Sequence, residues 1–165
     1  ELRSPLSVIS GYAELVRDIH WKDEAARNED GGSRRDYGIR VRFDAPKESV
    51  FIYADPLKLS QVLRNLLYNA INHTPEGDTI TVSLETKDDH TLRLSVTNPG
   101  VPISEDIWER YQRSQHQSGR RMGTGIGLSI VSTILDAHGM KYGVDSDEKG
   151  TSFWFEITES GSNQL

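Results

Sequence analysis

The order of apolar and polar residues along the chain predicts a mixed set of strands and helices. Short runs that are apolar, or that alternate apolar and polar residues between turn-forming residues, are typical of strands. Such runs are found at residues 39–43, 50–53, 79–86, 91–97, 142–146 and 151–158. Apolar residues that recur at i, i+3 and i+4 predict helices. These occur at residues 1–28, 57–73 and 125–138.

The helix expected from residue 57 has the clearest boundaries. Asp55 is a good N-cap, and Pro56 suits the first helical turn, where the N–H that proline lacks is not needed. The helix should end near His73, because Thr74-Pro75-Glu76-Gly77 follows.

Strands and helices do not alternate regularly, which predicts an α+β fold with a mixed, mostly antiparallel sheet covered by helices on one face. We expect one N-terminal helix to precede it. Its apolar stripe would have to pack on the following domain or on another chain. The expected divisions are the helix at 1–28, a charged linker at 29–37, one globular domain at 38–158 and a tail at 159–165.

Length and composition narrow the class of protein. The chain has 165 residues, which suits a single domain. Its net charge of -6 and pI near 5.4 argue against general nucleic-acid binding. It has no cysteine, which excludes disulfides and cysteine-ligated zinc, and no apolar run long enough to span a bilayer. These features predict a cytosolic domain.

A stripe of side-chain amides runs along the helix predicted at 57–73. Gln61, Asn65, Asn69 and Asn72 fall roughly 120° from the apolar face at the helical angle per residue. Asparagine is a mediocre helix former, but its amide can donate, accept and coordinate a cation. A single asparagine would be interpreted as part of a solvated flank. Asn65 and Asn69, one turn apart, instead predict a binding site.

Alternate glycines lead into the helix predicted at 125–138. The segment Gly123-Thr124-Gly125-Ile126-Gly127-Leu128 allows a phosphate to approach the backbone closely, and a helix start offers free N–H groups. It matches neither a Walker loop nor a Rossmann fingerprint. Taken alone, such a helix start is more often structural than ligand-binding.

Two further segments are candidates for ligand contact. The loop at 109–122 carries Arg110, Arg113, Arg120 and Arg121, which could clamp phosphate or simply be solvated. Asn98-Pro99-Gly100 ends a predicted strand, so Asn98 would stand where it can read the edge of a base, although Asn-Pro-Gly alone is an ordinary turn.

In chain order, these segments resemble the ATP-binding catalytic domain of sensor histidine kinases, a family of the group that includes gyrase, the Hsp90 chaperones and MutL. The resemblance covers about residues 38–158. Its motifs are an asparagine box at 55–74, a first glycine box at 98–103, an aromatic box at 107–113, a second glycine box at 123–131 and a strand motif at 150–155. Glu1-Leu2-Arg3-Ser4-Pro5-Leu6 resembles the phosphoacceptor motif without its histidine, which would make 1–28 part of a dimerisation helix.

The resemblance implies a two-layer Bergerat fold that binds ATP and Mg²⁺. By it, Asn69 would bind Mg²⁺ and phosphate, Asn65 would contact phosphate, and Asn98 would face the adenine amino group. Thr151 would line the adenine end, and Glu1 would be the base or orienting partner of the acceptor histidine. The complete implied nucleotide-binding set is Asn65, Asn69, Asn72, His73, Asn98, Gly100, Ile103, Arg110, Tyr111, Arg113, Gly123, Thr124, Gly125, Ile126, Gly127, Leu128 and Thr151.

The implied function is that of the catalytic core of a two-component sensor histidine kinase. Such a core transfers the γ-phosphoryl group of ATP to a histidine, from which it passes to the receiver domain of a response regulator. The acceptor histidine is not in this sequence, so we expect ATP binding without autophosphorylation. A parent homodimer formed through dimerisation helices, a cytoplasmic location and membrane attachment only through segments outside this chain are also implied.

The sequence departs from the family pattern in three places. Asn98 stands where aspartate is usual, Pro102 replaces the second glycine of its box, and Asn72 stands where a basic residue is common. Contact with the γ-phosphate would then fall to Arg110 or Arg113. Two alternatives stay open. One is an interaction module of this fold that has lost nucleotide binding, and the other is a serine kinase or ATPase of this fold.

Overall fold

The computed structural model describes residues 4–7, 38–46, 51–88, 90–100, 102–103, 107 and 125–158. Predictions that concern Glu1, the linker and the arginine-bearing loop lie outside the described residues. The elements, in chain order, are β1 (Ser4–Ser7), β2 (Arg40–Asp44), β3 (Phe51–Ala54), α2 (Pro56–His73), β4 (Thr79–Asp88), β5 (Thr91–Asn98), α4 (Gly125–Ala137), β6 (Tyr142–Asp147) and β7 (Gly150–Thr158). Within these ranges, no helix is long and apolar enough to cross a membrane.

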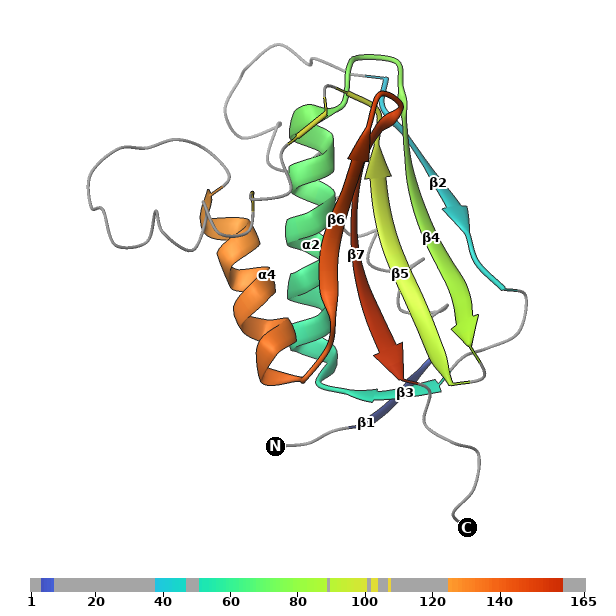
Figure 1. Ribbon diagram of the computed structural model, residues 1–165, viewed down its shortest axis with the longest axis vertical. Helices are drawn as coiled ribbons and strands as arrows, with labels where there is room; N and C mark the ends of the chain where they lie inside the picture. The colour runs from blue at the N-terminus through green and yellow to red at the C-terminus, as the bar shows by residue number, and fades with distance from the viewer. Residues whose placement is uncertain are drawn as a thin grey trace, which may run out of the picture.

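The main sheet has five strands in the order β2-β4-β5-β7-β6 (Figure 1). β2 runs parallel to β4, and the other neighbours are antiparallel. The prediction of a mixed, mostly antiparallel sheet is therefore confirmed. Where β5 pairs with β7, Leu94 lies opposite Phe155 and Asn98 lies opposite Thr151.

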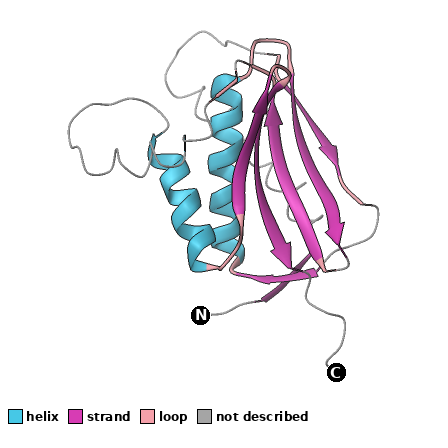
Figure 2. Cartoon of the chain, viewed as in Figure 1, coloured by secondary structure: helices cyan, strands magenta, loops and turns pink. Residues whose placement is uncertain are grey.

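α2 and α4 cover one face of this sheet, which gives the two layers expected (Figure 2). Alternate strand residues point toward the helices, as the pleat requires. Burial of each such aliphatic or aromatic side chain contributes roughly 1.5–3 kcal/mol. The strands contribute the buried residues Ile80, Val82, Leu84, Leu92, Leu94, Val96, Phe153, Phe155 and Ile157. The helices contribute Leu59, Val62, Leu63, Leu66, Leu67, Ala70, Leu128, Val131, Ile134 and Leu135.

The start of α2 follows from the residues that precede it. Asp55 Oδ1 accepts hydrogen bonds from Leu57 N at 2.9 Å and from Lys58 N at 3.2 Å. A cap of this kind contributes about 1 kcal/mol. At the other end, Thr74 Oγ1 donates to Ala70 O at 2.6 Å. The predicted boundaries of this helix are confirmed, and with them the stripe on which its asparagines lie.

The opposite face of the sheet carries polar residues around a stacked arginine and tryptophan. The Arg93 guanidinium lies 3.8 Å from the centroid of the Trp154 ring. Arg93 Nη2 also donates to Glu156 Oε1 at 2.8 Å. Trp154 covers Gly143 so closely that a Cβ there would lie 2.5 Å from Trp154 Cζ2. This cluster ties β5, β6 and β7 together on the face away from the helices.

β1 and β3 form a separate two-stranded antiparallel sheet (Figure 1). The prediction of a helix from residue 1 is therefore wrong at Ser4–Ser7, which form a strand. Pro5 explains part of the difference, because proline disfavours the helical conformation in the preceding residue and is tolerated in an edge strand. The strand predicted at 50–53 is also present, but it pairs with β1 outside the main sheet.

β2 is less buried than its alternating pattern predicts. Val41 packs partly against the core, whereas Phe43 is 42% exposed. β2 is an edge strand with a single neighbour, β4. Its position in the sheet accounts for the exposure.

Candidate functional site

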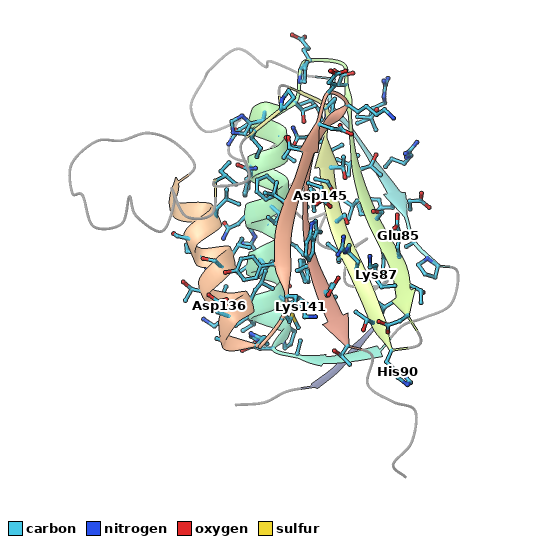
Figure 3. The ribbon with its side chains drawn as sticks, viewed as in Figure 1. Glu85, Lys87, His90, Asp136, Lys141 and Asp145 are labelled. Atoms are coloured by element: carbon cyan, nitrogen blue, oxygen red, sulfur yellow. The ribbon has the colours of Figure 1, made fainter. Side chains whose placement is uncertain are left out.

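The predicted motifs of the described chain meet at one end of the molecule. The C-terminal end of α2, the N-terminal end of α4, the end of β5 and the β6–β7 hairpin all lie there (Figure 1). The labelled Asp136 near the C-terminal end of α4, Lys141 just before β6, and His90 lie toward the opposite end (Figure 3). The candidate nucleotide site is therefore built from segments that are far apart in the sequence.

Asn65 of α2 faces the first turn of α4. A Cβ added to Gly127 would lie 3.8 Å from Asn65 Cβ, Cγ and Oδ1. Asn65 Nδ2 is buried and has no hydrogen-bond partner within the described part of the chain. Leaving a buried amide donor unpaired costs about 1–3 kcal/mol, so it calls for an explanation. A ligand atom that accepts from Nδ2 would supply one.

The other predicted residues of α2 differ in exposure. Asn69 is buried, at 7% exposure, one turn beyond Asn65 on the same stripe. Side-chain amides are mostly exposed in proteins, so burial of Asn69 on this polar stripe supports a binding role. Asn72 and His73 are exposed. The structure thus brings Asn65 and Asn69 together in a sheltered position and leaves Asn72 in contact with solvent.

Gln61, the first amide of the predicted stripe, lies elsewhere. It lines a shallow groove of about 220 Å³ between the helices, together with Lys58, Ser129, Ile130, Thr133 and Ile134. Gln61 shares this groove with residues from the middle of α4, whereas Asn65 faces the start of α4, so the two helices run antiparallel. Only the part of the stripe from Asn65 onward reaches the glycine-rich helix start.

The turn after β5 lies against the end of α2. Gly100 has φ 151°, which favours glycine, and a Cβ there would lie 3.1 Å from His73 O. A side chain at this position would push the turn away from the helix. The first glycine box and the asparagine box are therefore in contact through the backbone of Gly100 and His73.

A hydroxyl network holds the adenine end predicted around Thr151. Thr151 is buried beside Asn98, and its Oγ1 lies 2.9 Å from Ser146 Oγ. Ser146 Oγ in turn accepts from Ile103 N at 2.9 Å. Ser146 therefore ties the segment that follows the first glycine box to the β6–β7 hairpin. The sequence interpretation missed this residue, and its only signal was a position across the hairpin from Thr151.

Asn98 is 3% exposed, and its Nδ2 donates to Pro99 O at 3.0 Å. The backbone of Gly150 is packed directly on this turn, since a Cβ at Gly150 would meet the carbonyl of Asn98 and lie 3.0 Å from Pro99 Cα. Asn98 is thus a buried amide whose orientation is set by its neighbour. Pro102, the second departure from the family pattern, is exposed.

Not all predicted residues are described. Arg110, Tyr111, Arg113, Gly123 and Thr124 lie outside the described residues, as does Glu1. The backbone at Gly125 and Ile126 forms the start of α4. The Leu128 side chain is buried in the hydrophobic core, so any contact with nucleotide would come from its backbone.

Among the residues that the structure describes, two ionisable groups have clearly shifted pKa values, and both lie away from this end. Burial, aided by the nearby Asp136 carboxylate, raises the pKa of Tyr142. The backbone N–H of His90 lowers the pKa of Asp88. Asp88 pairs with Thr91 at the far end of β5 from Asn98. The buried Asn69 and Asn98, and Asn65 with its buried Nδ2, carry neutral amide side chains.

The sequence of the chain is similar to those of known proteins. The family described as "Histidine kinase-, DNA gyrase B-, and HSP90-like ATPase" matches residues 54–161. The sensor histidine kinase CusS of Escherichia coli (strain K12) is 41% identical over 123 residues, which cover 72% of this chain and 25% of CusS. The chain thus spans about a quarter of the length of this relative.

Solved structures agree with the sequence match. The nucleotide-free catalytic domain of histidine kinase ThkA is 31% identical with a TM-score of 0.72, and the alignment covers 96% of this chain and 97% of that one. ThkA in complex with the response regulator protein TrrA is 26% identical with a TM-score of 0.68, and the alignment covers 98% of this chain and 43% of that one. The chain therefore belongs to the family of histidine kinase-, DNA gyrase B- and HSP90-like ATPases, as the ATP-binding catalytic domain of a two-component sensor histidine kinase.

Proposed function

We propose that ATP binds with Mg²⁺ at the end of the molecule where Asn65 faces Gly127. The observation that supports this most strongly is the buried Nδ2 of Asn65 beside the first turn of α4, which has no hydrogen-bond partner among the described residues. The helix start offers backbone N–H groups and a positive dipole end, both of which favour phosphate. A phosphate oxygen at this position would accept from Asn65 Nδ2 and from these N–H groups together.

The described residues fit a Mg²⁺ ion held partly by the nucleotide. Asn69 is the amide we assign to it, because its side-chain oxygen is a hard ligand of the kind Mg²⁺ accepts. Among the described residues, no three acidic or histidine side chains form a cation cluster. Mg²⁺ would therefore take its remaining ligands from phosphate and water, as is usual for this ion. When bound, it would neutralise phosphate charge during transfer.

The adenine end would be formed by Asn98 and Thr151, with Gly100 and Ile103 shaping the turn beside it. In phosphoryl transfer the protein mainly positions the reactants and stabilises charge. Asn65, Asn69 and the amides of α4 would fix the triphosphate, while the network of Ser146 would keep the base end rigid. Arg110, Tyr111 and Arg113, or Asn72 and His73, would complete the phosphate contacts.

The proposed ATP binding of this domain leads to a proposal for the activity of the whole protein. The γ-phosphoryl group would pass to a histidine of the phosphoacceptor motif, with Glu1 as its base or orienting partner, and then to a response regulator. ThkA, solved in complex with the response regulator protein TrrA, supports a partner of that class. A parent dimer joined through dimerisation helices, in the cytoplasm, is part of the same proposal. Because the motif histidine is absent from this sequence, the 165-residue chain would bind ATP without labelling itself.

Isothermal titration calorimetry with a non-hydrolysable ATP analogue tests this proposal. We expect saturable binding with Mg²⁺ and much weaker binding with excess EDTA. The absence of binding heat at millimolar ligand would instead favour an interaction module without nucleotide, the reading motivated by Asn98 and Pro102. Binding that is unchanged by EDTA would remove the role assigned to Asn69.

A further inference from the structure

The face of the main sheet that points away from the helices carries opposite charges at its two edges. No described helix lies on this open face (Figure 2). On the edge strand β2, Arg40 and Arg42 alternate with a residue that packs against the core, so both point to the open face. On the other edge strand, β6, Asp145 and Asp147 point to the same face for the same reason. All four charged side chains are exposed.

The register of the strands puts these charges in matching rows across the sheet. Arg42 pairs with Thr81 of β4, and the row continues through β5 and β7 to Asp145 of β6. Arg40 lies two residues along β2 from Arg42, and Asp147 lies two residues along β6 from Asp145, both toward the nucleotide end. Each of the two rows therefore begins with a positive charge and ends with a negative one.

This pattern is complementary to itself under one rotation. A second copy, placed face to face with a two-fold axis parallel to the strands over β5, reverses the order of the strands and keeps the rows. Arg42 of each copy then faces Asp145 of the other. Arg40 likewise faces Asp147. An axis perpendicular to the strands would instead set the two acidic β6 strands against each other, and like charges in contact are strongly unfavourable.

The same arrangement brings an acceptor to two buried donors on the open face. Trp154 Nε1 and Arg93 Nε have no hydrogen-bond partner among the described residues. Asp44 of β2 begins the row that runs through Trp154 to Gly143. The carboxylate of Asp44 in one copy thus comes to the stacked Arg93 and Trp154 of the other. Tryptophan and arginine are the residue types that often carry most of the binding energy at an interface.

We propose that the open face of the sheet, with Arg42 and Asp145 at its two edges, pairs two copies of this chain face to face. The inference does not need nucleotide, so it goes beyond the proposed function. With strands about 4.8 Å apart and a rise of about 3.3 Å per residue, the five strands present roughly 600 Å². Two copies bury about 1,200 Å², the lower limit of specific interfaces, which favours a reversible dimer.

The direction of the axis has a consequence for the nucleotide sites. A rotation about an axis parallel to the strands keeps the two ends of the molecule apart, so both nucleotide ends lie at the same end of the dimer. The helices cover the other face of each sheet, and they therefore lie on the outside of the pair (Figure 2).

Sedimentation equilibrium of charge-reversed variants tests the pairing. We expect the unchanged chain, without nucleotide, to show a monomer–dimer equilibrium in the micromolar range. Arg42→Glu alone and Asp145→Arg alone should each weaken it by at least about tenfold, because like charges then face each other. An equimolar mixture of the two variants should associate again, since both pairs across the axis regain opposite charges. Arg64→Glu, on exposed α2, is the control and should leave association unchanged.

The row of Arg93 gives a test in the opposite direction. It sets Glu85 of one copy opposite Glu156 of the other, so Glu85→Lys should tighten the dimer by several-fold.

Circular dichroism would verify that every variant folds. A chain that stays monomeric at millimolar concentration would overturn the inference and leave the open face to a partner other than a second copy. Association that persists in both single variants, or that the mixture does not restore, would overturn it as well.

Discussion

Asn65 and Gly127 lie face to face across the contact between α2 and α4, with 3.8 Å between the Asn65 side chain and the place where a Gly127 side chain would begin. The missing Cβ leaves the Asn65 amide beside the first turn of α4, where its Nδ2 is buried and unpaired among the described residues. This pair joins two motifs that are separated by about 60 residues of sequence. It is the geometric basis of the proposed phosphate site.

Gly127→Ala should separate ligand binding from stability. A Cβ at 3.8 Å is in ordinary van der Waals contact, so the fold should accept it, and alanine favours a helix interior by up to about 1 kcal/mol over glycine. The methyl group would nevertheless narrow the space beside Asn65. We expect an unchanged or higher melting temperature together with ATP affinity lowered by about tenfold, measured by calorimetry. Undiminished affinity would argue against phosphate binding at this contact.

Asn69→Ala should abolish Mg²⁺-dependent nucleotide binding while unfolding stays cooperative. The truncation removes the amide assigned to the cation, and the small cavity should cost only about 1 kcal/mol of stability. Titrations with and without Mg²⁺ measure the effect. Gln61→Ala is the matched control, because it removes an amide from the same helix at an exposed groove position. If the two variants bind Mg²⁺ and nucleotide equally well, the assignment of Asn69 fails.

Ser146→Ala should weaken binding of the adenine base, because Ser146 holds Ile103 and Thr151 in position. The change removes the acceptor of the Ile103 N–H and the partner of Thr151 Oγ1, each a bond of about 1 kcal/mol. We expect lower stability and a several-fold loss of ATP affinity, with less effect on binding of inorganic tripolyphosphate, which has no base.

Ser152→Ala is the control for this variant. It removes a hydroxyl on the next strand, where Ser152 Oγ accepts from Thr97 Oγ1 at 2.9 Å. Residue 152 lies beside buried Thr151, so its side chain points to the opposite face of the sheet. A similar loss of stability with unchanged ATP affinity is expected. An equal loss of affinity in both variants would mean that Ser146 acts through general stability alone.

Gly143→Ala should destabilise the sheet without touching the site. The added Cβ would lie 2.5 Å from Trp154 Cζ2, so the indole must move off its position under Arg93. We expect a loss of about 1–3 kcal/mol in the free energy of unfolding, the usual result of overpacking. Denaturant unfolding of Gly143→Ala in a Trp154→Leu background gives the comparison. In that background, Gly143→Ala should lower the free energy of unfolding much less than it does in the unchanged chain. An equal loss in both backgrounds would show that the clash with the indole ring is not the cause.

The fold was largely predictable because its signals are local. A few neighbouring residues are enough to predict each of these elements: the helix start at Asp55-Pro56, the apolar face of α2 and the alternating strands. The pairing of β1 with β3 and the exposure of Phe43 depend on which neighbours a strand finds, and a period of two does not contain that information. A helix was expected at Ser4–Ser7 because the apolar residues of 1–28 recur at helical spacing, a pattern that does not report the pairing of this segment with β3.

The candidate site was predictable in its residue types but not in its contacts. Asn65, Asn69 and the glycines in the first turn of α4 stood out because asparagine and glycine are poor choices for a helix unless they are needed there. Ser146 was missed because an isolated serine in a strand is unremarkable until the hairpin register sets it opposite Thr151. The hydrogen bond from Asn98 to Pro99 depends on side-chain orientation, which no sequence pattern records.

The most direct test of the account is to follow the asparagine side-chain amides by nuclear magnetic resonance as a Mg²⁺ complex of a non-hydrolysable ATP analogue is added to ¹⁵N-labelled protein. We predict that the Nδ2 signals of Asn65, Asn69 and Asn98 and the backbone amide of Gly127 shift together and saturate at one ligand concentration. Shifts confined to the groove around Lys58 and Ile134, or the absence of shifts at saturating ligand, would contradict the claim that the nucleotide binds between α2 and the start of α4.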